Sequence, residues 1–101
     1  MTVNLYANEV VIKAGDTVKT VDDNKIAGKL IVTNQRIYFK VIDNVYENHN
    51  LEILPDSIEE VIYFGGMFSR KGLNLVTRDG KTYSFPLKKR DEIGQLINTM
   101  Y

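Results

Sequence analysis

The sequence predicts a mainly β fold of about seven short antiparallel strands followed by one C-terminal α-helix. Three observations support this prediction. Apolar and polar residues alternate over much of the chain before Pro86, as in strands with one buried face. Short polar pairs interrupt the alternation where hairpin turns are expected. After Pro86 the apolar residues recur at the intervals of an amphipathic helix.

The clearest predicted hairpin joins residues 28–33 to residues 36–41. The pair Asn34-Gln35 lies between them and suits a tight turn, because Asn tolerates a positive φ angle. Ahead of this hairpin the alternation is weaker. Two strands, residues 10–13 and 17–21, are expected there on either side of Gly15-Asp16.

Alternation in residues 36–41 assigns each side chain to a face of the sheet. Ile37, Phe39 and Val41 are predicted to point inward, and Arg36, Tyr38 and Lys40 outward. We therefore expect Arg36 to lie across the outer face.

Two further strands, residues 50–54 and 58–64, are expected around a turn at residues 55–57. Ile58, Ile62 and Phe64 form one inward set for the second of them. A second hairpin then turns at Asp79-Gly80, since both turn positions favour a positive φ angle. Its predicted core side chains are Leu73, Leu75, Tyr83 and Phe85.

The period changes after Pro86, where four apolar residues form one helical stripe: Ile93, Leu96, Ile97 and Met100. Asp91 and Glu92 suit the first turn of this helix, because the helix dipole favours negative charge there. The basic residues just before them are expected at or ahead of the cap. A helix of about a dozen residues is marginal alone in water, so it must dock on the sheet.

The composition excludes several classes of protein. The 101 residues carry 13 Lys and Arg against 13 Asp and Glu, which is not the composition of a disordered chain or of a basic nucleic-acid binder. The chain has no Cys and one His, so disulfides and thiolate metal sites are impossible and a zinc site is not expected. No signal peptide or membrane-spanning run is visible, and we expect a cytoplasmic protein that needs no cofactor.

Three segments resemble the GRAM domain and related bacterial pleckstrin-homology-like domains: residues 8–11, 28–39 and 53–58. The first contains an early Glu, Glu9, and the second follows the pattern Gly-x-Leu-x-x-Thr-Asn-x-Arg-aliphatic-x-Phe. The resemblance implies that residues 1–101 form one split β-barrel of about seven antiparallel strands capped by the helix. It also implies a binding module for a lipid headgroup or a protein, because none of the motif's roles is catalytic.

Charge marks the first candidate site. Residues 1–66 have a net charge of −4 and residues 67–101 a net charge of +4. The basic residues of the second part would attract an anionic surface if they met on one face, although scattered, solvated charges are the simpler alternative. They are Arg70, Lys71, Arg78, Lys81, Lys88, Lys89 and Arg90.

The loop at residues 65–72 is the second candidate, because apolar Met67 and Phe68 stand beside basic residues and between glycines. Such a tip suits a membrane interface or a partner's groove, unless Phe68 folds back onto the sheet. Lipid-binding relatives gather basic residues in the first inter-strand loop. In this chain that loop, residues 21–25, carries Asp22 and Asp23, which would repel a headgroup.

Two weaker possibilities remain. Four tyrosines, Tyr38, Tyr46, Tyr63 and Tyr101, could support self-association, and an uncovered strand edge could pair with a peptide or a second copy. His49, Asp56 and Ser57 have no spacing that orients a catalytic triad. The sequence therefore predicts a non-enzymatic module that docks a protein or peptide, with peripheral binding to an anionic membrane as the alternative.

Overall fold

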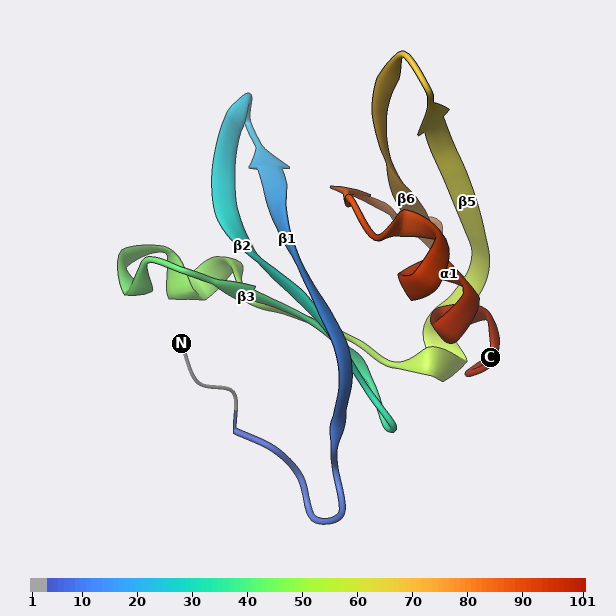
Figure 1. Cartoon of the computed structure of the whole chain (residues 1–101). Helices are drawn as coiled ribbons and strands as arrows, with labels where there is room; N and C mark the ends of the chain where they lie inside the picture. Colours follow the sequence, from blue (N-terminus) through green and yellow to red (C-terminus); the bar gives the residue numbers. More distant parts are fainter. Residues whose placement is uncertain (1–3) are drawn as a thin grey trace.

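The computed structural model describes residues 4–101, which form two antiparallel sheets and one α-helix. Figure 1 shows the sheets facing each other, with the helix beside the second sheet. The first sheet has the order β1-β2-β3-β4 and the second β5-β6-β7. Within the described range no ladder joins the two sheets, so the strands form two layers and not a closed barrel.

The elements have the following bounds. The first sheet contains β1 (Val11–Val21), β2 (Asn24–Thr33), β3 (Ile37–Val41) and β4 (Leu51–Ile53), with the 3-10 helix η1 (Asn44–His49) between the last two. The 3-10 helix η2 (Pro55–Ser57) leads to β5 (Ile58–Gly66), β6 (Ser69–Thr77) and β7 (Thr82–Pro86), and the chain ends with α1 (Arg90–Asn98).

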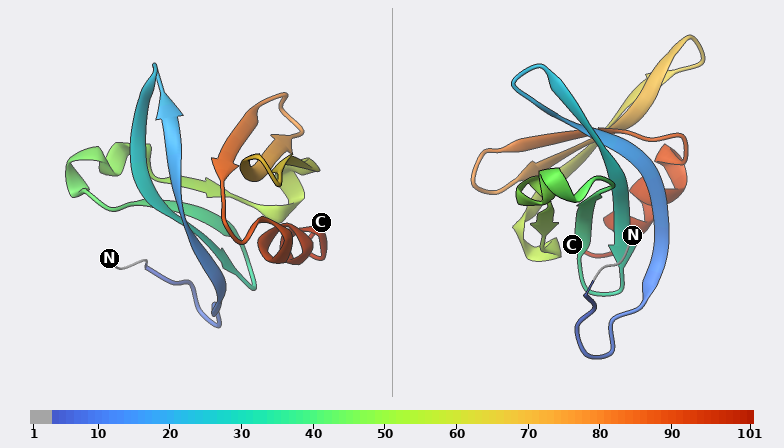
Figure 2. Two further views of the ribbon diagram at one scale, coloured as in Figure 1. Left: turned by 45° about the horizontal axis from the view of Figure 1, so that its top comes forward. Right: turned by 90° about the vertical axis from the view of Figure 1, so that its left-hand side faces the viewer.

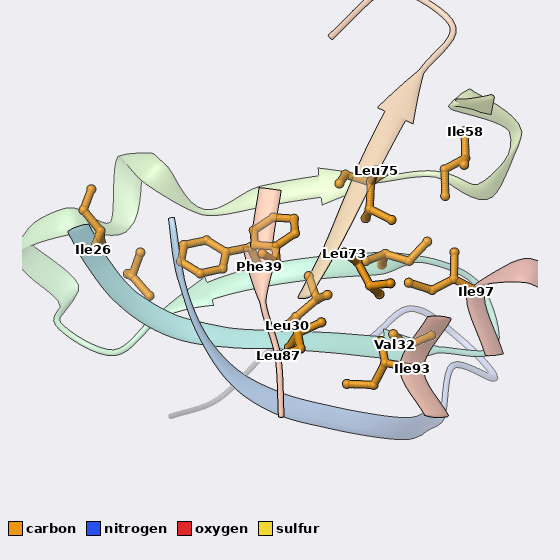
Figure 3. Close-up of a cluster of buried hydrophobic side chains, with 14 residues drawn as sticks. Ile26, Leu30, Val32, Phe39, Ile58, Leu73, Leu75, Leu87, Ile93 and Ile97 are labelled. Atoms are coloured by element: carbon orange, nitrogen blue, oxygen red, sulfur yellow. The ribbon is translucent and has the colours of Figure 1, made fainter. Parts of the chain in front are cut away.

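The core lies between the two sheets and α1. Phe39 of the first sheet stacks on Phe85 of the second, with ring centroids 5.7 Å apart. Ile93 and Ile97 of α1 are fully buried in the same cluster, which Figure 3 shows in close-up. Burial of each such side chain contributes about 2 kcal/mol, which is how a nine-residue helix becomes stable.

Both predicted hairpins are present, but positive φ angles agree with the expectation only in part. At the Asp79-Gly80 turn Gly80 has the expected positive φ angle, 86°, and Asp79 does not. Asp22 and Asp23, between β1 and β2, have φ angles of 49° and 66°. Asn34 is not among the residues with positive φ. At the β2–β3 turn the Thr33 hydroxyl instead accepts a hydrogen bond from the Arg36 amide at 2.9 Å, so a side chain takes the place of a backbone partner.

Two strand predictions were wrong. The two strands expected near the N-terminus are one continuous strand, β1, because Gly15 and Asp16 pair with β2 without interruption. In β5 a register shift between Ile58 and Glu60 changes the inward set. Val61 packs on the core, whereas Ile62 is 40% exposed and Phe64 lies outside the core cluster.

Arg36 lies on the outer face, as expected, beside Tyr38 and Glu52, but it is only 4% exposed. Residues 4–10, the N-terminal segment ahead of β1, cover it. Arg36 Nε donates to Glu9 Oε2 at 2.9 Å, and Nη1 donates to Glu52 Oε2 at 2.6 Å. Nη2 donates to the Asn4 carbonyl at 2.7 Å. The guanidinium therefore connects the N-terminal segment, the β2–β3 hairpin and β4.

The carboxylates of this Arg36 network are held in their charged form. Hydrogen bonds from Arg36, and secondarily from Thr33, lower the pKa of Glu9 from 4.5 to about 2. A hydrogen bond from the Tyr6 hydroxyl, followed by one from Arg36, lowers the pKa of Glu52. Folding thus lowers the proton affinity of both groups, and they favour the folded state only while ionised.

We predict that acid removes this contribution in a defined window. The folded state binds fewer protons than the unfolded state between pH 4.5 and about 2, so stability present above pH 4.5 is lost as pH falls through that range. Glu9→Gln should lower the free energy of unfolding at neutral pH by about 3 kcal/mol and flatten the acid dependence. Urea unfolding at several pH values measures both effects. Exposed Glu47→Gln is the control, and an equal loss there would contradict the prediction.

A second stability prediction concerns Gly28 in β2. A Cβ atom at this position would lie 2.5 Å from the Lys40 carbonyl oxygen and 2.6 Å from the Phe39 ring, which is fixed in the core. Gly28→Ala should therefore destabilise the fold by about 1–3 kcal/mol. Gly66→Ala is the matched control, since no atom lies within 4 Å of its added Cβ. Equal urea midpoints for the two variants would show that the close approach is unimportant.

Candidate functional site

The hairpin of β5 and β6 forms an arm that extends beyond the body of the molecule (Figures 1 and 2). Met67 and Phe68 make its two-residue turn and are 90% and 98% exposed. Phe68 therefore does not fold back onto the sheet. At the base of the turn the ladder has a register shift between Phe64 and Gly66, where Gly65 adopts a φ angle of 80°. A side chain at Gly65 would collide with the Arg70 backbone, so the bend requires glycine.

A groove of about 1120 Å³ lies beside the base of this arm. One side is the edge of β1 at residues 14–18, and the other is formed by the arm and the β7–α1 connection. Six basic side chains line it: Lys29, Arg70, Lys71, Lys88, Lys89 and Arg90. We call this the basic groove.

Strand pairing explains why basic residues distant in sequence meet there. Gly72 pairs with Pro86 at the end of the β6–β7 ladder. The Leu87 amide then donates to the Lys71 carbonyl at 2.9 Å, which extends the pairing by one step. Lys88 and Lys89 follow directly, so they emerge next to Lys71 at the start of α1.

The charges of the basic groove are only partly neutralised. Lys29 lies 3.6 Å from Asp16, and Arg90 lies 2.9 Å from Asp91. Arg70, Lys71, Lys88 and Lys89 form no ion pair with any residue in the range 4–101. Four cations that lack an acidic partner in this range surround one concave surface, and such an arrangement attracts anions.

The structure separates the candidate residues into three groups. Met67, Arg70, Lys71, Lys88, Lys89 and Arg90 line the basic groove, and Phe68 stands next to it at the tip of the arm. Arg78 and Lys81 lie apart, at the β6–β7 turn, where Arg78 Nε donates to the Asp56 carbonyl at 3.0 Å. Sequence reasoning missed Lys29 and the β1 edge, because no local pattern relates them to residues 66–90.

The β1–β2 turn projects from the same end of the molecule as the arm, and the two hairpins diverge from each other (Figure 2). Its tip carries the exposed residues Asp22 and Asp23. This end of the molecule therefore presents an acidic tip and an apolar tip with basic residues below it.

The weaker sequence candidates are dispersed. Tyr38 lies against Arg36, and Tyr46 lies near His49. Tyr63 and Tyr101 are both hydrogen-bonded to Asn98.

The residues of the possible catalytic triad have other partners. The Ser57 hydroxyl donates to the Leu54 carbonyl at 2.7 Å, and the His49 ring contacts Tyr46. Residues 4–101 contain no cluster of three acidic or His side chains that could hold a metal.

Comparison with solved structures identifies the fold. The chain superposes on the C-terminal domain of an unknown protein from Leishmania infantum with a TM-score of 0.77 and 14% identity, over 93% of this chain and 85% of that one. It superposes on the Vps36 N-terminal PH domain with a TM-score of 0.68 and 21% identity, over 96% of this chain and 80% of that one. No family model and no curated protein sequence matches the chain. The chain therefore has a pleckstrin-homology-like fold.

Proposed function

We propose that this domain is a non-enzymatic binding module that docks peripherally on anionic membrane surfaces from the cytoplasmic side. One observation supports this most directly: the exposed apolar tip, Met67 and Phe68, adjoins a groove lined by basic side chains. An apolar element beside basic residues is the combination that binds membrane interfaces. No helix in residues 4–101 is long and apolar enough to span a bilayer.

The two parts of the site contribute different energies. Each Lys or Arg near an anionic leaflet contributes about 1 kcal/mol, which salt screens. Insertion of Phe68 contributes through the hydrophobic effect, which salt does not screen. Phe68 gives up almost no protein contact on insertion, because it is 98% exposed in the free protein. Binding should therefore be rapid, reversible and strongest at low ionic strength.

A tryptophan at the tip tests insertion directly, because the chain contains no Trp. Phe68→Trp should shift its emission to shorter wavelength when vesicles of phosphatidylcholine and phosphatidylserine are added, since the indole leaves water. In sedimentation with the same vesicles, Phe68→Ala should lower the affinity about tenfold. A phosphatidylcholine-only vesicle should produce neither effect. An unshifted emission with anionic vesicles at low salt would overturn the proposal.

The basic groove can be tested with matched pairs of substitutions. Lys88→Gln with Lys89→Gln should lower the affinity for anionic vesicles more than tenfold, at about 1 kcal/mol per charge. Arg78→Gln with Lys81→Gln removes the same charge at the β6–β7 turn and should have little effect. Equal losses in the two variants would show that net charge, and not the groove, controls binding.

Removal of the acidic charges at the β1–β2 tip should raise the affinity for anionic vesicles, in contrast to removal of the basic charges of the groove. Because Asp22 and Asp23 project from the same end as the arm, they should oppose approach to an anionic surface. Asp22→Asn with Asp23→Asn should raise the affinity several-fold at low salt, and Asn tolerates the positive φ angles found there. Asp43→Asn with Glu47→Gln, around η1, is the charge-matched control. Equal gains in the two variants would contradict a role for the tip itself.

Docking of a protein or peptide is the second candidate function. Within residues 4–101 no ladder joins the outer edge of β1, which forms one wall of the basic groove and where the Thr17 hydroxyl donates to the Pro86 carbonyl at 2.7 Å. An extended acidic peptide could add to this edge beside that contact. Hydrogen exchange distinguishes the two candidates. A peptide would protect the amides of residues 14–18, whereas a vesicle would protect Met67 and Phe68.

The finer assignment to the GRAM group is also a proposal. It is supported by the residues of the resemblance, because Thr33 and Arg36 at the β2–β3 turn donate to Glu9, and Asn34 accepts from the Val10 amide.

A further inference from the structure

Arg90 differs from the other basic residues of the groove in the contacts of its guanidinium. Its Nη1 atom donates to the carbonyls of Phe64 and Gly65, at 2.8 Å each. Its Nε atom donates to Asp91 at 2.9 Å. The side chain is only 17% exposed. Arg90 is therefore occupied by the protein itself and has little capacity for an external anion.

The two carbonyls that Arg90 binds lie at the point where the arm bends. The β5–β6 ladder is shifted between Phe64 and Gly66, and Gly65 has a φ angle of 80°. Beyond this point only the Gly66 and Ser69 pair continues the ladder before the exposed turn. Without a second support, the distal arm would be restrained by few backbone hydrogen bonds.

Arg90 is well placed to supply that support. It is the first residue of α1, which is anchored in the core by Ile93 and Ile97. Its guanidinium carbon lies 5.7 Å from the centroid of the Tyr63 ring, so it also contacts the strand just before the bend. One side chain thus connects the anchored helix to the backbone of the bend and to the residue that precedes it.

We infer that Arg90 is a positioning residue that fixes the direction of the arm, so that the Met67–Phe68 tip and the basic groove meet the same anionic surface together. This inference rests on the proposed function. It assigns Arg90 a role distinct from that of Arg70, Lys71, Lys88 and Lys89, which supply charge.

Arg90→Gln tests the inference in the Phe68→Trp background, with vesicles of phosphatidylcholine and phosphatidylserine. We expect about a tenfold loss of affinity. At saturating lipid we also expect the emission of the introduced tryptophan to remain at longer wavelength, because the tip is no longer directed into the bilayer. If Arg90 contributed only its charge, the affinity would fall but the emission at saturation would be unchanged, which would overturn the inference. Arg90→Lys keeps a donor for the two carbonyls and should restore most of the shift.

Arg78→Gln is the matched control, since Arg78 also donates from its guanidinium to a backbone carbonyl, that of Asp56. It removes one charge and one such bond elsewhere and should leave the emission shift intact. Without vesicles, Arg90→Gln should accelerate hydrogen exchange in residues 65–70, and Arg78→Gln should not. Unchanged exchange in Arg90→Gln would refute the positioning role. Absence of vesicle binding by the Phe68→Trp parent would refute only the proposed membrane binding. A failure of the proposed function can therefore be distinguished from a failure of the positioning role.

Discussion

The buried guanidinium of Arg36 is the constraint around which the first sheet is organised. A buried charge is tolerated only when its hydrogen-bonding groups are satisfied by partners of opposite charge or by carbonyl oxygens. Glu9, Glu52 and the Asn4 carbonyl provide these partners, and the rings of Tyr6 and Tyr38 lie 4.1 and 5.0 Å from the guanidinium carbon. The N-terminal segment belongs to no strand, yet it is held in place because it carries part of this pairing.

This arrangement explains what the family-like motif does. Thr33 donates to Glu9 at 2.6 Å, and Asn34 accepts from the Val10 amide at 2.8 Å. The residues that carried the resemblance thus hold the β2–β3 turn against residues 7–10, with Gln35 adding a bond to the Ala7 carbonyl. They form a structural network in which Glu9, Thr33, Asn34, Gln35 and Arg36 all lie outside the lining of the basic groove, although Lys29 of the same 28–39 segment belongs to that lining. The motif therefore indicated the fold, and the charge pattern indicated where a ligand could bind.

The strands, the second hairpin and the C-terminal helix were predictable because each rests on a local repeat of apolar residues. The repeat is every two residues in the strands and about every three and a half residues in the helix. The burial of Arg36 and the face of Ile62 were not. Arg36 is polar and alternates with core residues, but a segment distant in sequence covers it. In β5 a single register shift reverses the assignment of the residues after Glu60. The meeting of Lys71 with Lys88 depends on the β6–β7 register, which the Asp79-Gly80 turn sets but charge counting does not show. The opposite net charges of the two parts of the chain, and the apolar and basic residues of the 65–72 loop, were the signals for that site.

The exposed turn at Met67 and Phe68 has a consequence for how such a domain can diversify. Neither side chain contributes to the core, and a Cβ at Gly66 would meet no atom within 4 Å. Sequence changes at the tip are therefore nearly free of any penalty in fold stability, provided that Gly65 is kept for the bend. Selection can alter what the tip recognises while the scaffold stays constant, much as variable loops do on an antibody framework.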